Sequence, residues 1–295
     1  MEMRSDSRLR QSRVARCAGA YDLPTPLRTG IPFLGLAADR RRLRIGTGTH
    51  VVKGRVNYQA GAVMPNQTWR KPTSTEIHIL KAKLLASRRG FISVINCHVP
   101  SIVKLCQKVG SAPAPAGLPR KIQDLTNAEC EEILRELREH RGLATVENQC
   151  LGVFAGPAGQ ETVTVEAATN EKIGLHIDSW SGRPLCERMK APSRISINLG
   201  SGPRELLLVN LPVSEIGESF GQILDPLSKN ESLTEIGRRF LRTFPRYPVV
   251  SIMIQPFEGY IAPTENMIHD GSTANVTSDD VSLVILGHFS IPGEH

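Results

Sequence analysis

Gly174-Leu175-His176-Ile177-Asp178-Ser179-Trp180 places an imidazole and a carboxylate two residues apart, and Ile268-His269-Asp270-Gly271 follows much later in the chain. In an extended segment, residues i and i+2 point to the same face, so His176 and Asp178 can reach one point. Two ligands do not complete a metal site, and His269 is the best candidate for the third. Two His and one carboxylate on one side of a metal form a facial triad, which leaves the opposite positions free. The sequence therefore predicts a metal site formed by His176, Asp178 and His269.

Segments with β character surround both motifs. The alternating residues 161–167 predict a strand before the first motif. Residues 194–200 and 205–210 have a hairpin signature, because the turn-like Ser201-Gly202-Pro203-Arg204 joins them. Further strands are expected at 249–254 and 280–289. A site divided between an early and a late strand suits a jelly roll, in which distant strands face each other across a barrel.

The chain resembles the Fe(II)/2-oxoglutarate-dependent oxygenases over roughly residues 145–295. The resemblance rests on His176-Ile177-Asp178, on the hairpin that begins at Arg194, and on Glu258-Gly259-Tyr260-Ile261-Ala262-Pro263 before His269. That last segment is similar to the Gly-x-x-x-x-Pro…His stretch of double-stranded β-helix enzymes. The resemblance implies Fe(II) as the metal, 2-oxoglutarate and O2 as cosubstrates, and succinate and CO2 as products. It also implies hydroxylation of an unactivated C–H bond in a small molecule, such as an amino-acid-derived or natural-product intermediate.

The identity of the carboxylate ligand bears on the reaction. Related halogenases have a small residue where this chain has Asp178, so that chloride can bind. The resemblance therefore favours hydroxylation, desaturation or ring formation over halogenation.

The distal carboxylate of 2-oxoglutarate requires a cation, and Arg binds carboxylates in a bidentate manner. Many family members have an Arg or Lys shortly after the distal His, but no basic residue lies between His269 and His288. Other branches take the anchor from the strand after His-x-Asp, which implies Arg194. The cosubstrate-binding residues predicted on this basis are Arg194, Ser196 and Asn198, which share one strand face, with Arg204 in reserve.

Four further residues are candidates for a role at the site. Trp180 and Arg183 follow the ligand pair and are candidates for substrate contact, although Trp180 could equally be a core residue. His288 competes with His269 as the third ligand, because it lies in a well-defined predicted strand; the preceding turn favours His269. Asp270 could orient a ligand imidazole or cap the turn before Gly271.

The predicted architecture is mainly β with flanking helices. We expect a double-stranded β-helix (cupin-like) core at 145–295, an N-terminal α/β support region at 31–144 and a basic, flexible tail at 1–30. A strand is expected at 91–97 and a loop at 111–117. Helices are expected at 75–89 and at 231–241. A third helix should begin at the capping box Thr126-Asn127-Ala128-Glu129, end at Gly142 and pack on the outside of the barrel.

Composition limits the class of protein. The chain has 295 residues and a net charge of +7. Residues 1–71 hold 14 Lys and Arg against 4 Asp and Glu, a balance of +10, which leaves −3 for the rest. The sequence has no apolar run long enough for a bilayer. Its first residues are charged and lack an apolar stretch, so we do not expect a secretory signal. Its six Cys form no Cys-x-x-Cys pair, so we expect reduced thiols and a cytoplasmic location.

Two other classes of function remain open at this point. The absence of a basic residue after His269 supports a cupin-type metalloenzyme that works without 2-oxoglutarate. The basic tail would suit a non-catalytic β-barrel binding protein that holds nucleic acid, although a solvated leader is the favoured interpretation. The substrate of the oxygenase could also be a protein side chain, and the sequence contains no signal for the oligomeric state.

Overall fold

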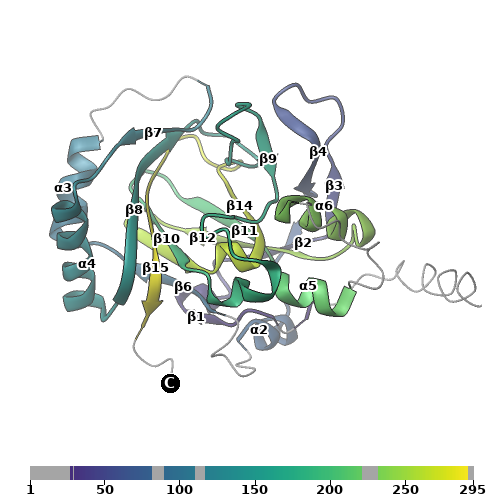
Figure 1. Cartoon of the computed structure of the whole chain (residues 1–295), viewed down its shortest axis with the longest axis horizontal. Coiled ribbons are helices and arrows are strands. Elements are labelled where there is room, and N and C mark those ends of the chain that lie inside the picture. The colour runs from purple at the N-terminus through teal and green to yellow at the C-terminus, as the bar shows by residue number, and fades with distance from the viewer. Residues whose placement is uncertain (1–26, 29, 82–89, 110–116, 221–231, 292–295) are drawn as a thin grey trace, which may run out of the picture.

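The computed structural model describes residues 27–28, 30–81, 90–109, 117–220 and 232–291 (Figure 1). Its centre consists of two large sheets that face each other. The seven-stranded sheet has the order β1 (Phe33–Gly35), β6 (Ile92–Asn96), β13 (Glu258–Ala262), β10 (Ser193–Asn198), β15 (Asp280–Ser290), β8 (Ala144–Gly156) and β7 (Arg120–Gln123). The five-stranded sheet has the order β14 (Met267–Ser272), β11 (Arg204–Pro212), β12 (Val249–Ile254), β2 (Leu43–Gly46) and β5 (Trp69–Arg70).

Smaller elements surround these sheets. A three-stranded sheet contains β3 (Thr49–Val51), β4 (Tyr58–Pro65) and β9 (Lys172–Gly174). The helices are α2 (Ser74–Lys81), α3 (Pro100–Val109), α4 (Asn127–Arg141), α5 (Val213–Phe220) and α6 (Leu233–Thr243), with 3-10 turns η2 (Leu36–Ala38), η4 (Leu185–Lys190) and η5 (Thr264–Asn266). The prediction of a mainly β protein with flanking helices is confirmed. No helix in the described ranges is long and apolar enough to cross a membrane.

From β10 onward the chain crosses repeatedly between the two large sheets, although β11 and β12 follow one another within the five-stranded sheet. β10, β13 and β15 belong to the seven-stranded sheet, whereas β11, β12 and β14 belong to the five-stranded sheet. The predicted hairpin of 194–200 with 205–210 is therefore wrong, because β10 pairs with β13 and β15, and β11 pairs with β12 and β14. The turn between them carries the chain across the molecule. The Asn198 side chain stabilises that turn, since its Nδ2 donates to the carbonyl O of Gly202 and its Oδ1 accepts from the N–H of Gly200.

The predicted strand at 161–167 is also wrong, apart from an isolated bridge between Val165 and Lys172. The N–H groups of Val163 and Thr164 donate to Asp270 Oδ1 at 3.3 and 3.1 Å. The carbonyl O of Thr164 accepts from the N–H of Ile173 in β9, which is too little pairing to form a regular strand. The alternation of polar and apolar residues therefore does not produce a strand here.

The helix predictions are largely confirmed. α4 begins with the predicted capping box, in which Thr126 and Glu129 bond each other's backbone N–H, and it ends at Gly142 in the left-handed conformation. α6 begins after Ser232, whose side chain accepts from the N–H of Glu235. α2 begins at Ser74, and residues 82–89 of that prediction lie outside the described residues. Residues 111–116 of the predicted loop and residues 1–26 and 29 of the predicted tail also lie outside them. Leu27, at the end of the predicted tail, is buried.

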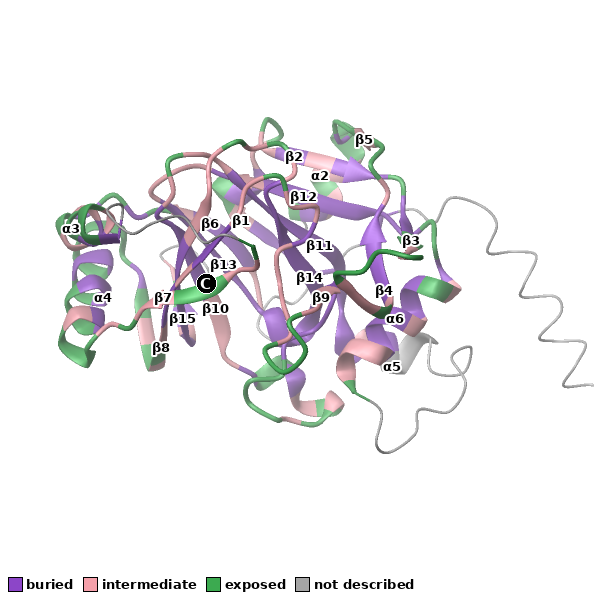
Figure 2. Cartoon of the chain, turned by 90° about the horizontal axis from the view of Figure 1, so that it is seen from above, coloured by how far each residue is buried: buried purple, intermediate pink, exposed green. Residues whose placement is uncertain are grey.

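Side-chain alternation divides the apolar residues into three clusters. On β10, Ile195 and Ile197 point outward and pack with α3 and α4, which flank the seven-stranded sheet. On β11, Leu207 and Val209 point outward and pack with α5 and α6. The inner residues of β12 fill the space between the sheets with apolar residues of β1, β2 and β6. Figure 2 shows that most of the strand residues in both sheets are buried.

The N-terminal strands therefore extend both large sheets. β1, β6 and β7 join the seven-stranded sheet, and β2 and β5 join the five-stranded sheet. The apolar packing occupies the end of the sandwich that these β1, β2 and β6 strands cover. The other end, between β14 and the strands β10, β15 and β8, holds polar side chains and contains the candidate site.

Candidate metal centre

Two extended segments bring the predicted ligands together. The backbone N–H of His176 donates to the carbonyl O of His269 at 3.0 Å, and the N–H of His269 donates to the carbonyl O of His176 at 2.8 Å. This pair of hydrogen bonds sets the two residues directly opposite each other, with ring centroids 4.7 Å apart. Asp178 follows on the same segment, and its N–H donates to the carbonyl O of Thr264 at 3.2 Å.

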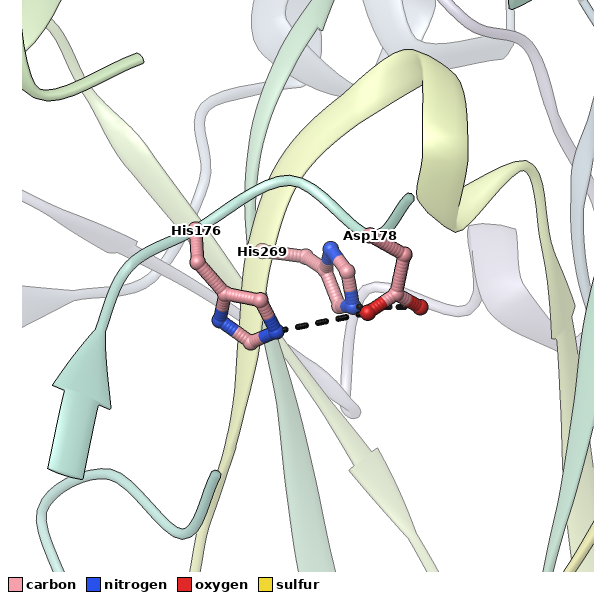
Figure 3. Close-up of side chains that lie close together, drawn as sticks. All are labelled: His176, Asp178 and His269. Atoms are coloured by element: carbon pink, nitrogen blue, oxygen red, sulfur yellow. Dashed lines mark ion pairs between the residues drawn. The ribbon is translucent and has the colours of Figure 1, made fainter. Parts of the chain in front are cut away.

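The three side chains converge on one point (Figure 3). His176 Nε2 lies 3.5 Å from Asp178 Oδ1, and His269 Nε2 lies 3.6 Å from Asp178 Oδ2. One nitrogen or oxygen atom from each of the three residues lies within 4.8 Å of the others, and all three residues are buried. The rival ligand His288 lies elsewhere, with its side chain 39% exposed and its Nε2 3.7 Å from a carboxylate oxygen of Glu147.

Each imidazole directs a free nitrogen toward this point. His176 Nδ1 lies 2.9 Å from the carbonyl O of Gly174, and His269 Nδ1 lies 3.4 Å from the carbonyl O of Met267. A carbonyl oxygen only accepts, so each contact requires the proton on Nδ1 and leaves a lone pair on Nε2. Both Nε2 atoms are buried and have no hydrogen-bond partner in the described part of the chain.

The electrostatics favour an ionised Asp178 carboxylate beside a neutral His269 imidazole. Burial raises the pKa of Asp178, but the Arg194 guanidinium, with Nη2 3.0 Å from Asp178 Oδ2, and the two imidazoles outweigh it and hold that pKa well below its usual range. Burial lowers the pKa of His269 to about 3. For His176, burial lowers the pKa, and the carboxylates of Asp178 and Asp270 outweigh burial and raise it. A position that attracts a proton between these groups also attracts a cation.

Asp270 supports the site from behind. Its Oδ1 accepts from Thr164 Oγ1 at 2.8 Å and from the N–H of Gly271 at 2.7 Å, in addition to the N–H groups of Val163 and Thr164. Its Oδ2 lies 3.9 Å from His176 Nδ1. Asp270 therefore holds the neighbouring backbone and lies beside one candidate ligand without a hydrogen bond to it. It does not cap a turn before Gly271, because β14 continues through Gly271 to Ser272.

A cavity of about 460 Å³ opens in front of His269. Its walls include inner-face residues of the seven-stranded sheet, where Arg194 and Ser196 of β10 alternate with the outward Ile195 and Ile197. This volume lies within the range of about 300–1,000 Å³ that is usual for small-molecule sites. The lining from this sheet also contains Tyr260 of β13 and Asp280, Ser282 and Val284 of β15.

The cavity receives some of the predicted binding residues and not others. Arg194, Ser196 and Arg204 line it, and Arg204 Nη1 lies 3.2 Å from Asp280 Oδ1. Asn198 is not among the lining residues, because its amide bonds the turn after β10 and the carbonyl O of Ile254.

Of the two predicted substrate residues, one lines the cavity and the other does not. Trp180 lines the cavity while 54% exposed, and its ring lies 5.9 Å from the Arg194 guanidinium carbon. Arg183 is not among the lining residues, and its Nη1 lies 3.5 Å from Glu187 Oε2.

Several residues at this site escaped the sequence analysis. Tyr260 lies within the segment that carries the family resemblance, and Asp280 begins the predicted strand at 280–289, but the sequence assigned neither residue a role. Arg188 and Glu265 form a buried ion pair at 2.5 Å beneath the loop that follows Asp178. The alternation of β13 and β15 could have identified Tyr260 and Asp280, whereas nothing in the local sequence indicates that Arg188 and Glu265 meet.

Comparison with known proteins yields distant structural neighbours. No protein-family model and no curated protein sequence matches the chain. HygX from Streptomyces hygroscopicus, crystallised with nickel and 2-oxoglutarate bound, is 12% identical with a TM-score of 0.32, over 68% of this chain and 83% of HygX. A second structure of HygX, with iron bound, is 12% identical with a TM-score of 0.30, over 68% of this chain and 82% of that chain.

Proposed function

We propose that this chain is an Fe(II)- and 2-oxoglutarate-dependent oxygenase that hydroxylates an unactivated C–H bond of a small molecule. The observation that carries the proposal is the convergence of two unpartnered imidazole nitrogens and one carboxylate beside a cavity of about 460 Å³. The repeated crossing of the chain between two facing sheets supports a double-stranded β-helix as the fold. Iron and 2-oxoglutarate are also the groups with which HygX was crystallised.

The residues present fit a divalent transition metal. Two neutral imidazoles and an ionised carboxylate are the donor set of the non-haem Fe(II) facial triad. A buried nitrogen with no hydrogen-bond partner is costly, and a bound cation would remove that cost for both His176 Nε2 and His269 Nε2. Asp178 would supply the third bond, and Arg194 would keep it ionised.

For the distal carboxylate of 2-oxoglutarate we propose Arg204, which reverses the preference for Arg194 derived from the sequence. Arg194 already pairs with Asp178, directly beside the candidate metal ligands. Arg204 lies against Gly271, two residues beyond His269; its Nη1 lies 3.2 Å from Asp280 Oδ1, and its Nε has no hydrogen-bond partner among the described residues. Ser196 of β10, which is buried and also lines the cavity, would donate a further hydrogen bond.

When bound, Fe(II) with 2-oxoglutarate and O2 supplies the oxidant for C–H hydroxylation, with succinate and CO2 as products. The chain's own contribution is to hold three ligands on one side and to leave the cavity side open. The inner sheet faces exclude bulk water from the candidate ligands, which are all buried. Trp180, at the exposed end of the lining, would contact the substrate.

Production of succinate tests this proposal. The purified protein with Fe(II), ascorbate, 2-oxoglutarate and O2 should form succinate slowly even without the correct substrate. Asp178→Ala should abolish this formation, whereas Arg183→Gln should retain it, because Arg183 lies outside the cavity lining. Equal succinate formation by wild type and Asp178→Ala would contradict the proposal.

The cupin alternative retains one specific observation in its favour. The strand after His269 carries Asp280 into the cavity where many 2-oxoglutarate enzymes have a cation, and Asp280 pairs with Arg204. A cupin-type enzyme would bind the same metal but consume no 2-oxoglutarate. Metal-dependent consumption of O2 without succinate would therefore favour it. The nucleic-acid alternative depends on residues 1–26, which lie outside the described residues.

A further inference from the structure

The charged residues of the cavity are unevenly distributed along its length. Of the described residues that line it, four are Lys or Arg (Arg120, Lys121, Arg194 and Arg204) and one, Asp280, is acidic. Arg194 pairs with Asp178 and Arg204 pairs with Asp280, so both cations next to the candidate metal ligands have a carboxylate beside them. The other two cations lie on β7, at the opposite edge of the sheet.

The cations on β7 are available to a ligand. Arg120 has no hydrogen-bond or ion-pair partner within the described ranges, and it is exposed. Lys121 pairs with Asp124 at 2.6 Å, but both side chains are largely solvated, at 43% and 80% exposure. An exposed pair of this kind contributes little to stability, so a ligand anion can displace it readily. Asp124 itself is not among the lining residues.

The side chain of Lys121 lies along the cavity wall. A Cβ on Gly152 would lie 3.1 Å from Lys121 Cε, and Gly152 pairs with Val284, which lines the cavity. Lys121 also pairs in register with Phe154, another lining residue. The aliphatic part of Lys121 therefore packs along this wall, and its ammonium group lies at the outer end of the cavity.

The wall between the two groups of cations is partly apolar, although Ser282 and Asp280 of β15 also line it. Phe154 of β8 and Val284 of β15 line it from the seven-stranded sheet, and Val163 and Val165 line it from the loop opposite. β8 and β15 separate β7 from β10, which amounts to three inter-strand spacings, or about 14 Å. A ligand that reaches from Lys121 to the candidate metal ligands must therefore be elongated.

We infer that the substrate of this cavity is an elongated amphiphile with an anionic head group, which binds at Lys121, and an apolar body that extends along Phe154 and Val163 toward His269. The inference rests on the proposed function for the identity of the reaction, but the binding itself requires neither metal nor 2-oxoglutarate. A carboxylate and a phosphate head group share the required charge.

The test is displacement of a fluorescent probe. Energy transfer from Trp180 to 8-anilinonaphthalene-1-sulfonate reports occupancy of the cavity, and Trp180→Phe identifies the signal that comes from this site. Octanoate, octyl phosphate and octan-1-ol then compete with the probe, with saturating 2-oxoglutarate and Zn(II) present so that the cations near the metal are occupied. Both anions should displace the probe about tenfold more strongly than the alcohol does, which corresponds to ~1.4 kcal/mol. The stronger of the two anions identifies the head group.

Two variants make the outcome decisive. Lys121→Gln should remove most of the preference for the anions, and Lys121→Arg should restore it. Arg183→Gln is the matched control, since it is also a partly exposed cation paired with an acidic neighbour but lies outside the cavity lining. Equal displacement by octanoate and octan-1-ol in the wild type, or the same loss in Arg183→Gln as in Lys121→Gln, would overturn the inference. Either result leaves succinate formation as an independent test of the proposed function.

Discussion

Each histidine of the candidate site contacts a backbone carbonyl two residues earlier in the chain. His176 contacts Gly174 and His269 contacts Met267, in both cases through Nδ1. Because a residue and the one two positions before it lie on the same face of an extended chain, this contact directs Nε2 away from the backbone and toward Asp178. The donor atoms are thus oriented by buried backbone groups before any cation binds, as in metal sites whose ligands are fixed by their outer contacts.

Gly271 provides a prediction at this scale. A Cβ at this position would lie 2.8 Å from Arg204 Nη2 and 2.7 Å from Val163 Cγ2. The end of the Arg204 side chain would have to move, whereas His269 would stay paired with His176. We expect Gly271→Ala to weaken 2-oxoglutarate binding by about tenfold, or ~1.4 kcal/mol, with Fe(II) affinity unchanged. Calorimetric titration of the Fe(II)-loaded variant, beside Arg204→Gln, measures both affinities. Unaltered 2-oxoglutarate affinity in both variants would contradict the role proposed for Arg204.

The proximity of His176, Asp178 and His269 could be anticipated from the sequence, because residue type and spacing carry that information. Their role as metal ligands remains a prediction. The positions of Arg183 and Asn198 could not be anticipated. Arg183 turns toward Glu187, and Asn198 is used by the turn after β10. Both outcomes depend on local partners that strand alternation does not specify.

The loop that carries Asp178 is held by an ion pair from two other elements. Arg188, of η4, donates to the carbonyl O of Asp178 at 3.3 Å and to Glu265, of η5, at 2.5 Å. Glu265 also accepts from the N–H and the hydroxyl of Ser181. Arg188 and Glu265 are 3% and 1% exposed, so water cannot replace either partner. This pair positions the loop and, through it, one candidate ligand.

Arg188→Met should therefore be strongly destabilising. It leaves the Glu265 carboxylate buried without its charged partner, and breaking a buried pair in this way costs about 3–5 kcal/mol. Urea unfolding measures the free energy of unfolding. The control is Arg135→Met on α4, where the pair with Glu139 is exposed and contributes about 0–1 kcal/mol. Comparable losses in the two variants would contradict the positioning role.

The start of α2 gives a prediction about pH. Hydrogen bonds from Arg70 lower the pKa of Glu76 to about 2 despite partial burial, and the N–H of Thr73 adds to this effect. A carboxyl with a lowered pKa stabilises the fold above its ordinary pKa of 4.5, and this contribution is lost as pH falls through about 2. The difference in stability between wild type and Glu76→Gln should be full above that ordinary pKa and shrink as the pH falls below it. A constant difference across this range, measured by urea unfolding, would be evidence against this assignment.

Among the helices and strands, the sequence predicted correctly those features that depend on residues close together in the chain. The capping box of α4 joins residues three positions apart, and the sequence contains both partners. The pairing of β10 and β11 failed as a prediction because it depends on distant strands. Both faces of β10 are buried, and its partners β13 and β15 lie far along the chain.

The whole molecule is a sandwich whose two ends differ. The N-terminal strands β1, β2 and β6 contribute Phe33, Leu43 and Val94 to an apolar filling between the sheets. At the other end, the same inner faces present Arg194, Arg204 and His269 to the cavity. The sequence indicated a mainly β protein, but not that residues before 144 extend both sheets, because strand pairing over such separations has no signature in local periodicity.

The central claim is that this polar end binds Fe(II) and 2-oxoglutarate together. Anaerobic titration of the protein with Fe(II) and then 2-oxoglutarate, followed by visible absorption, tests it most directly. We predict a weak metal-to-ligand charge-transfer band that is lost in His269→Ala and retained in His288→Ala, whose imidazole lies beside Glu147 away from the cluster. Iron binding without this band would contradict the 2-oxoglutarate assignment, and failure to bind iron at all would contradict the metal centre itself.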